Sequence, residues 1–78
     1  MFAVRLKKLR LEKSLTQKQL GEIVGVIKQA VNNWEKGIAS PNLYTFKMLC
    51  DYFNVSADYL LGRTDKPEIN NTIGINNE

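Results

Sequence analysis

The stretch TQKQLGEIVGVIKQAVNNWEKG, residues 16–37, predicts two short helices joined by a tight turn. Thr16 is followed three residues later by Gln19, which is a capping-box pattern, so the first helix is expected to begin at Gln17. Gly25 is expected to end it, because glycine adopts the left-handed conformation at a helix C-terminus without a Cβ penalty. Both ends of the first helix are thus marked in the sequence.

A second helix is predicted from Ile27 to Lys36, with Gly37 ending it in the same way. Placed at roughly 100° intervals, its residues separate into two faces. The polar face consists of Lys28, Gln29, Asn32, Asn33 and Lys36. The packing face consists of Ile27, Ala30, Val31 and Trp34, with Glu35 at its edge. Most such polar faces are simply solvated, so a function for this one depends on the rest of the chain.

The first helix of the pair contains Gly21, although glycine inside a helix costs about 1 kcal/mol relative to alanine. Leu20 and Val24 lie on its apolar side. Close packing is the expected compensation, because a larger side chain at this position would keep another helix from approaching.

The chain has 78 residues, enough for one small domain with a modest core. Its hydrophobic fraction is 44%, and no apolar run approaches the roughly 18 residues of a membrane span, so no membrane role is expected. Residues 1–8 lack the apolar segment of a secretory signal, which favours a cytoplasmic location.

Cys50 is the only cysteine and histidine is absent, so no internal disulfide, metal site or cofactor is expected. Cys50 is interpreted as a small core residue rather than a reactive thiol. An enzyme is the weakest interpretation, since the sequence has no histidine base, no evident carboxylate pair and no glycine-rich phosphate loop.

The net charge of +3 is unevenly distributed along the chain. Residues 1–36 carry eight basic and three acidic side chains, whereas residues 37–78 carry three basic and five acidic ones. The positive half therefore contains the helix pair. Such asymmetry is frequent in nucleic-acid-binding proteins, although a domain this small can show it by chance.

Three further helices are predicted, so that five helices fill residues 2–62 of an all-α domain. The first covers residues 2–13, the fourth follows the N-cap residue Asn42 through LYTFKMLCDYF, and the fifth is ADYLL after Ser56. Residues 63–78 lack periodicity and are predicted to be a flexible polar tail. Alternatively, isoleucines in this tail order it against a partner subunit.

Arg10 lies beside the apolar stripe of the first helix, where arginine is seldom found without a partner. One interpretation is an ion pair with Glu35, the only acidic residue at the edge of the packing face. The other is a solvated guanidinium on a partly buried stem. Periodicity alone does not choose between them.

Taken together, these features resemble the Cro and phage-repressor type of helix-turn-helix DNA-binding domains, also called the Xre family. The resemblance covers residues 5–62, which include RLKKLRLEKSLTQKQLGEIVGV, AVNNWEKG and SPNLYTFKMLCDYFNVSADYLLG. It implies a compact five-helix, lambda-repressor-like domain, with the second and third helices forming the helix-turn-helix.

The resemblance also implies roles for individual residues. The second helix of the motif enters the DNA major groove in this family, so the implied base-reading residues are Lys28, Gln29, Asn32 and Asn33. Glutamine and asparagine can both donate and accept at adenine, which implies A·T pairs there, and lysine can donate to guanine. Phosphate contacts are implied for Gln17, Lys36, Lys8 and the backbone after Gly37. A structural ion pair is implied between Arg10 and Glu35.

Two departures from the family pattern stand out. Ile27 occupies a position where the family often has a capping serine or threonine, a loss worth about 0.5–2 kcal/mol. The loop of residues 38–40 lacks the basic side chains that many members place there. Phosphate binding is then expected to depend on lysines of the helices and on backbone amides.

The resemblance implies a sequence-specific transcriptional regulator, expected to be a repressor that binds an inverted-repeat operator in double-stranded DNA as a homodimer. The dimer surface is predicted around Tyr59 and Leu60 with the tail. The alternative is an antitoxin or anti-repressor module whose main partner is another protein. It is motivated by apolar side chains predicted to be exposed, namely Ile23, Ile38, Tyr44 and Tyr52.

Overall fold

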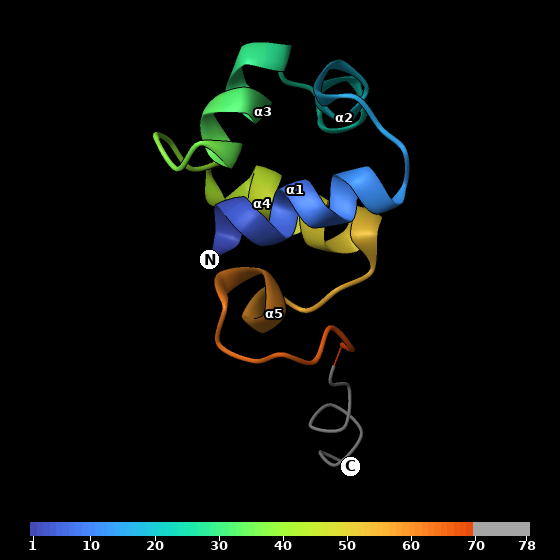
Figure 1. Ribbon diagram of the computed structural model, residues 1–78, viewed down its shortest axis with the longest axis vertical. Coiled ribbons are helices and arrows are strands. Elements are labelled where there is room, and N and C mark those ends of the chain that lie inside the picture. The colour runs from blue at the N-terminus through green and yellow to red at the C-terminus, as the bar shows by residue number, and fades with distance from the viewer. Residues whose placement is uncertain (70–78) are drawn as a thin grey trace.

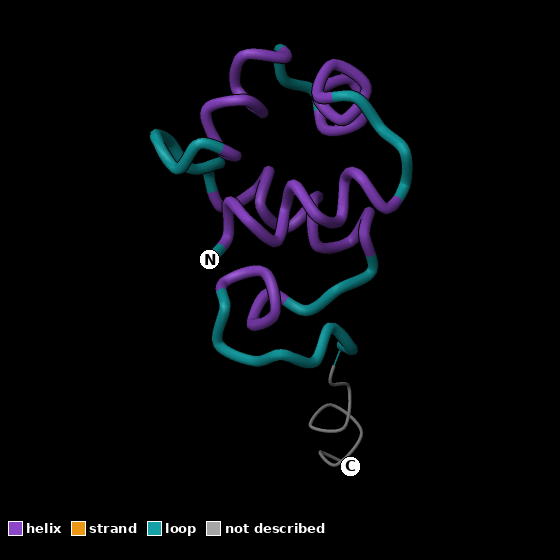
Figure 2. The backbone as a smooth tube through the Cα atoms, viewed as in Figure 1, coloured by secondary structure: helices purple, strands orange, loops and turns teal. Residues whose placement is uncertain are grey.

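The computed structural model describes residues 1–69, which fold into five α-helices without a strand. The helices are α1 (Phe2–Glu12), α2 (Gln17–Val24), α3 (Lys28–Glu35), α4 (Leu43–Phe53) and α5 (Ala57–Leu61). Figure 1 shows α2 and α3 at one end, α1 and α4 in the middle, and α5 at the other end. Short loops connect the helices, as the tube view shows (Figure 2). The predicted all-α, five-helix fold is confirmed.

The predicted ends of α2 are confirmed in detail. The Thr16 hydroxyl accepts from the backbone N–H of Gln19, and the Gln19 side chain accepts from the backbone N–H of Thr16. Gly25 has a φ of 80°, in the left-handed region that ends a helix. The third helix is one residue shorter at each end than predicted, because Ile27 and Lys36 are its two cap residues.

Gly21 allows a close approach, but the neighbour is not another helix as predicted. A Cβ atom at Gly21 would lie 2.5 Å from the carbonyl oxygen of Val26, which belongs to the turn between α2 and α3. The backbone N–H of Val26 also donates to the Gly21 carbonyl at 2.8 Å. The turn therefore packs directly on the α2 backbone, and glycine at position 21 makes room for it.

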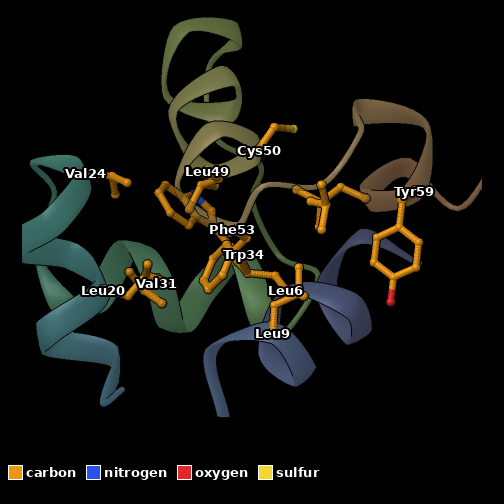
Figure 3. Packing of buried hydrophobic residues seen from close by; sticks show 12 residues of the cluster. Leu6, Leu9, Leu20, Val24, Val31, Trp34, Leu49, Cys50, Phe53 and Tyr59 are labelled. Carbon is orange, nitrogen blue, oxygen red and sulfur yellow. The ribbon is translucent and has the colours of Figure 1, made fainter. Parts of the chain in front are cut away.

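All five helices contribute to one hydrophobic core (Figure 3). Leu6, Leu20, Val31, Leu49 and Leu60 are completely buried, each on a different helix. Trp34 of α3 is also buried, which fixes the packing face of that helix. Ile27 was predicted on this face but is 73% exposed, because it precedes the first helical residue and its extended backbone follows another path.

The buried thiol of Cys50 confirms its predicted place in the core. Burial raises the pKa of this thiol, with a smaller contribution from the charge of Asp51. Since the thiolate is the reactive form, Cys50 is a packing residue in the folded domain.

Arg5 holds the segment after α5 against α1. Its guanidinium donates to the carbonyl oxygens of Tyr59 and Thr64, pairs with Asp65 at 3.0 Å, and lies 4.3 Å from the centre of the Tyr59 ring. Thr64 and Asp65 thus contact α1, and the flexibility predicted for the tail from residue 63 stays a prediction. The rest of that predicted tail, residues 70–78, lies outside the described residues, and the domain boundary at residue 62 stays a prediction.

The last helix does not offer the predicted dimer surface. Leu60 is completely buried and Tyr59 is only 8% exposed, because both side chains face the core. Leu61 of the same helix is exposed, as are Leu43 and Tyr44 at the start of α4. The prediction of a dimer surface around Tyr59 and Leu60 is therefore wrong.

None of the helices in residues 1–69 has the length and apolar character needed to cross a membrane. Within the same residues, no three histidine, cysteine, aspartate or glutamate side chains come together as a potential metal site.

Candidate nucleic-acid interface

The polar face of α3 points away from the core. Lys28 and Gln29 are exposed, whereas Asn32 and Asn33 are half-buried. Val31 and Trp34 anchor the opposite side of the helix in the core. The structure therefore places the four predicted base-reading residues on one outward surface, at the end of the molecule formed by α2 and α3 (Figure 1).

A buried ion pair fixes α3 relative to α1. Arg10 donates from Nε to Glu35 Oε2 at 2.7 Å and from Nη2 to Glu35 Oε1 at 2.9 Å. The two side chains are 9% and 3% exposed, and Arg10 also donates to the Leu15 carbonyl. This parallel, two-point geometry is the strongest that arginine and a carboxylate make. The predicted pair of Arg10 and Glu35 is confirmed.

Gln17 connects this ion pair to the outward surface. Its Nε2 donates to Glu35 Oε1 at 3.0 Å and to Asn32 Oδ1 at 3.3 Å. The family resemblance implies that Gln17 also braces the third helix, and these two contacts confirm it. The sequence did not identify Asn32 as a partner, since that contact depends on how α2 and α3 cross.

The exposed amides of Gln29 and Asn33 also pair with each other. Gln29 Nε2 donates to Asn33 Oδ1 at 3.0 Å, across one turn of α3. Gln29 Oε1 and Asn33 Nδ2 make no hydrogen bond within residues 1–69, so both are available to a ligand. The two side chains can therefore act together as a combined acceptor and donor.

The residues predicted to contact phosphate differ in how free their side chains are to do so. Lys8 on α1 and Lys36 at the end of α3 are exposed. Gln17 directs its side-chain nitrogen inward, although its backbone N–H lies at the N-terminus of α2. The first amides after Gly37 are already used, because Ile38 and Ala39 both donate to the Asn33 carbonyl. The phosphate contact predicted for the backbone after Gly37 stays a prediction.

The start of α3 lacks a side-chain cap, as the sequence predicted, because Ile27 is its N-cap residue. We expect Ile27→Thr to stabilise the domain by about 1 kcal/mol, since Ile27 is exposed and its extended backbone suits a capping hydroxyl. The measurement is the free energy of unfolding in urea. Ile27→Val is the matched control, because valine has the shape of threonine without the hydroxyl. Equal stability of the two variants would show that no cap forms.

The fold and the outward α3 surface define a helix-turn-helix domain of the phage-repressor type. A family model described as helix-turn-helix matches residues 6–60, and the chain therefore belongs to this family. The resemblance stated from the sequence is thereby confirmed.

Curated relatives and a solved structure agree with this assignment. The chain is 37% identical over 68 residues to the HTH-type transcriptional regulator YobD of Bacillus subtilis, covering 87% of this chain and 61% of YobD. It is 34% identical over 55 residues to the phage CTXphi transcriptional repressor RstR of Vibrio cholerae, covering 70% and 50%. The P22 c2 repressor protein, crystallised with a synthetic operator, superposes with a TM-score of 0.73 at 30% identity, covering 77% of this chain and 91% of that one. The chain thus spans between half and two thirds of the length of these two curated relatives.

Proposed function

We propose that this protein is a sequence-specific, DNA-binding transcriptional repressor that acts in the cytoplasm on an inverted-repeat operator. The observation that carries the proposal is the outward surface of α3, where Lys28, Gln29, Asn32 and Asn33 gather while Trp34 anchors the helix from behind. An α-helix fits the major groove, and amide and ammonium groups match the donors and acceptors of base edges there.

Affinity comes from phosphate contacts at the rim of this surface. Lys8 and Lys36 are exposed, and the N-terminus of α2 offers the backbone N–H of Gln17. These groups position α3 on the duplex without reading sequence. The neutral loop after α3 adds no basic side chain, so we expect a shallow dependence of affinity on salt.

The proposed unit on DNA is a homodimer. One reading helix spans few base pairs, and two copies on half-sites about 34 Å apart multiply the discrimination. Leu43, Tyr44 and Leu61 are more suitable for the contact than the buried Tyr59 and Leu60, because they are 83%, 76% and 53% exposed.

The test is the double variant Gln29→Ala/Asn33→Ala. We expect the ratio of operator to random-sequence affinity to fall at least tenfold, because a good amide–base pair contributes about 1–3 kcal/mol to discrimination. Random-sequence affinity should stay nearly constant, since no charge is lost. Operator selection from random DNA, followed by titration of both DNA types, measures this.

Lys47→Ala is the control, because this exposed α4 side chain has no proposed DNA contact. It should leave the affinity ratio unchanged. An unchanged ratio in the double variant would contradict the assignment of these residues.

The alternative is a module that binds another protein, such as an antitoxin or anti-repressor partner. The exposure of Ile38 and Tyr44, at 70% and 76%, favours it. Purification from the native cell separates the two proposals: a stoichiometric protein partner without retained DNA would support the alternative and count against the operator-binding role.

A further inference from the structure

The N-terminal end of α3 carries a large apolar side chain at the start of a polar surface. Ile27 is the N-cap residue of this helix and is 73% exposed. It is followed directly by Lys28 and Gln29, which are exposed and polar. Its apolar neighbours Val26 and Ala30 pack against the hydrophobic core instead. Ile27 therefore presents apolar surface to the solvent at the end of α3 where the outward surface begins.

The backbone of Ile27 is held in place although its side chain is exposed. Its carbonyl accepts from the backbone N–H of Ala30 at 3.0 Å, and the preceding residue, Val26, donates to the Gly21 carbonyl at 2.8 Å. A Cβ atom at Gly21 would lie 3.5 Å from the carbonyl carbon of Ile27, so this backbone lies against α2. Branching at Cβ also restricts the side chain to few rotamers. A contact made by Ile27 would therefore cost little conformational entropy.

The chemistry of isoleucine limits what this side chain can contribute. It has no donor or acceptor, so it can neither cap α3 nor hydrogen bond to a phosphate or a base. It can only bury apolar surface. In the major groove, the apolar group on the base edges is the C5-methyl group of thymine. Cytosine methylated at C5 carries a methyl group at the same ring position, whereas unmodified cytosine has a hydrogen atom there.

We propose that Ile27 recognises the 5-methyl group of a pyrimidine, so that affinity depends on whether the base at that position is methylated. The proposal rests on the function proposed above. Residues at the N-terminal end of a reading helix contact base edges, and Ile27 directly precedes the first of them, Lys28. Thymine and 5-methylcytosine are the two sources of such a methyl group. An apolar contact is not directional and accepts both, so binding can respond to cytosine methylation of the operator.

The experiment begins with selection of the operator from random double-stranded DNA by the full chain. Each thymine of the operator is then replaced singly by deoxyuridine, which removes only the methyl group. In a second series, each cytosine is replaced singly by 5-methylcytosine. We expect the methyl group to change affinity roughly fourfold at one position of a half-site, which is the effect of burying one such group. Titration followed by fluorescence anisotropy measures these affinities.

Three variants assign the methyl effect to a side chain. Ile27→Ala should abolish it, because the apolar surface is removed. Ile27→Ser should also abolish it while stabilising the domain through a capping hydroxyl, which separates recognition from stability. Ile38→Ala is the matched control, because Ile38 is similarly exposed, at 70%, but lies beyond the other end of α3, and this variant should keep the full effect. Circular dichroism confirms the fold of each variant before titration.

A methyl effect at a thymine that disappears in Ile27→Ala would support the proposal with thymine as the source. An effect found only in the 5-methylcytosine series, and lost in the same variant, would identify methylated cytosine. A methyl effect that persists in Ile27→Ala would overturn the proposal, since another side chain would then contact the methyl group. The absence of any methyl effect in both series would overturn it as well.

Neither negative result would count against operator binding. Sequence selection by the unmodified chain, and its loss in Gln29→Ala/Asn33→Ala, would still support the proposed function. If the unmodified chain selects no sequence, the proposed function itself fails, and the role of Ile27 fails with it.

Discussion

Arg10→Met is expected to lower the free energy of unfolding by about 3–5 kcal/mol. The substitution leaves the Glu35 carboxylate, which is 3% exposed, without the guanidinium that compensates its burial. A domain of this size has a total stability of only about 5 kcal/mol, so much of the variant should be unfolded at room temperature. Urea titration followed by circular dichroism at the helix band measures the loss.

Two further variants identify the cause of this loss. Arg10→Met/Glu35→Leu removes both charges and should recover most of the stability, because an apolar pair of similar volume can replace a buried ion pair. Lys47→Met breaks an ion pair with Asp51 whose side chains are 74% and 63% exposed, and it should cost less than about 0.5 kcal/mol. If the double variant is as unstable as Arg10→Met, lost packing rather than the uncompensated charge is responsible.

Gly21→Val is expected to cost about 3 kcal/mol, the upper part of the range for overpacked sites. A Cβ at Gly21 would lie 2.5 Å from the backbone oxygen of Val26, and a backbone atom cannot move aside as a side chain end can. Alanine should also destabilise, although helix propensity alone favours it by about 1 kcal/mol. Because the contact joins α2 to the turn before α3, DNA affinity should fall together with stability.

Gly25 offers the matched comparison for this steric effect. It has a φ of 80°, and a Cβ there would meet nothing within 4 Å, so the need for glycine is conformational. Asparagine tolerates the left-handed region, and Gly25→Asn should therefore cost less than Gly25→Ala. Gly21→Asn should gain no such relief. Equal costs of asparagine and alanine at both positions would contradict this distinction.

Local signals in the sequence were sufficient to predict much of the fold. The capping box at Thr16 and the glycine at 25 act within one turn of chain, so they predicted the bounds of α2 without tertiary information. Ile27 was misplaced because helical periodicity was extended one residue beyond the true start of α3. Tyr59 and Leu60 were misassigned to a dimer surface, since the five-residue helix that contains them is too short for its periodicity to reveal which side is buried.

The candidate site was predictable as a set of residues but not as a set of orientations. Periodicity placed Lys28, Gln29, Asn32 and Asn33 on one face of a helix. Which atom of an amide points outward depends on partners from other helices, as Gln17 and Glu35 show for Asn32. These contacts depend on how α2 and α3 pack together, which the periodicity of a single helix does not predict.

The contacts of Arg5 have a consequence for how additional chain can be attached. By bonding to Tyr59 and Thr64, this side chain directs the described end of the polypeptide past α5, at the pole opposite to α3 (Figure 1). A fused domain, an affinity label or a fluorescent reporter joined directly to residue 69 would therefore begin on the side of the molecule opposite to α3. Arg5 in this way separates that attachment point from the outward surface of α3.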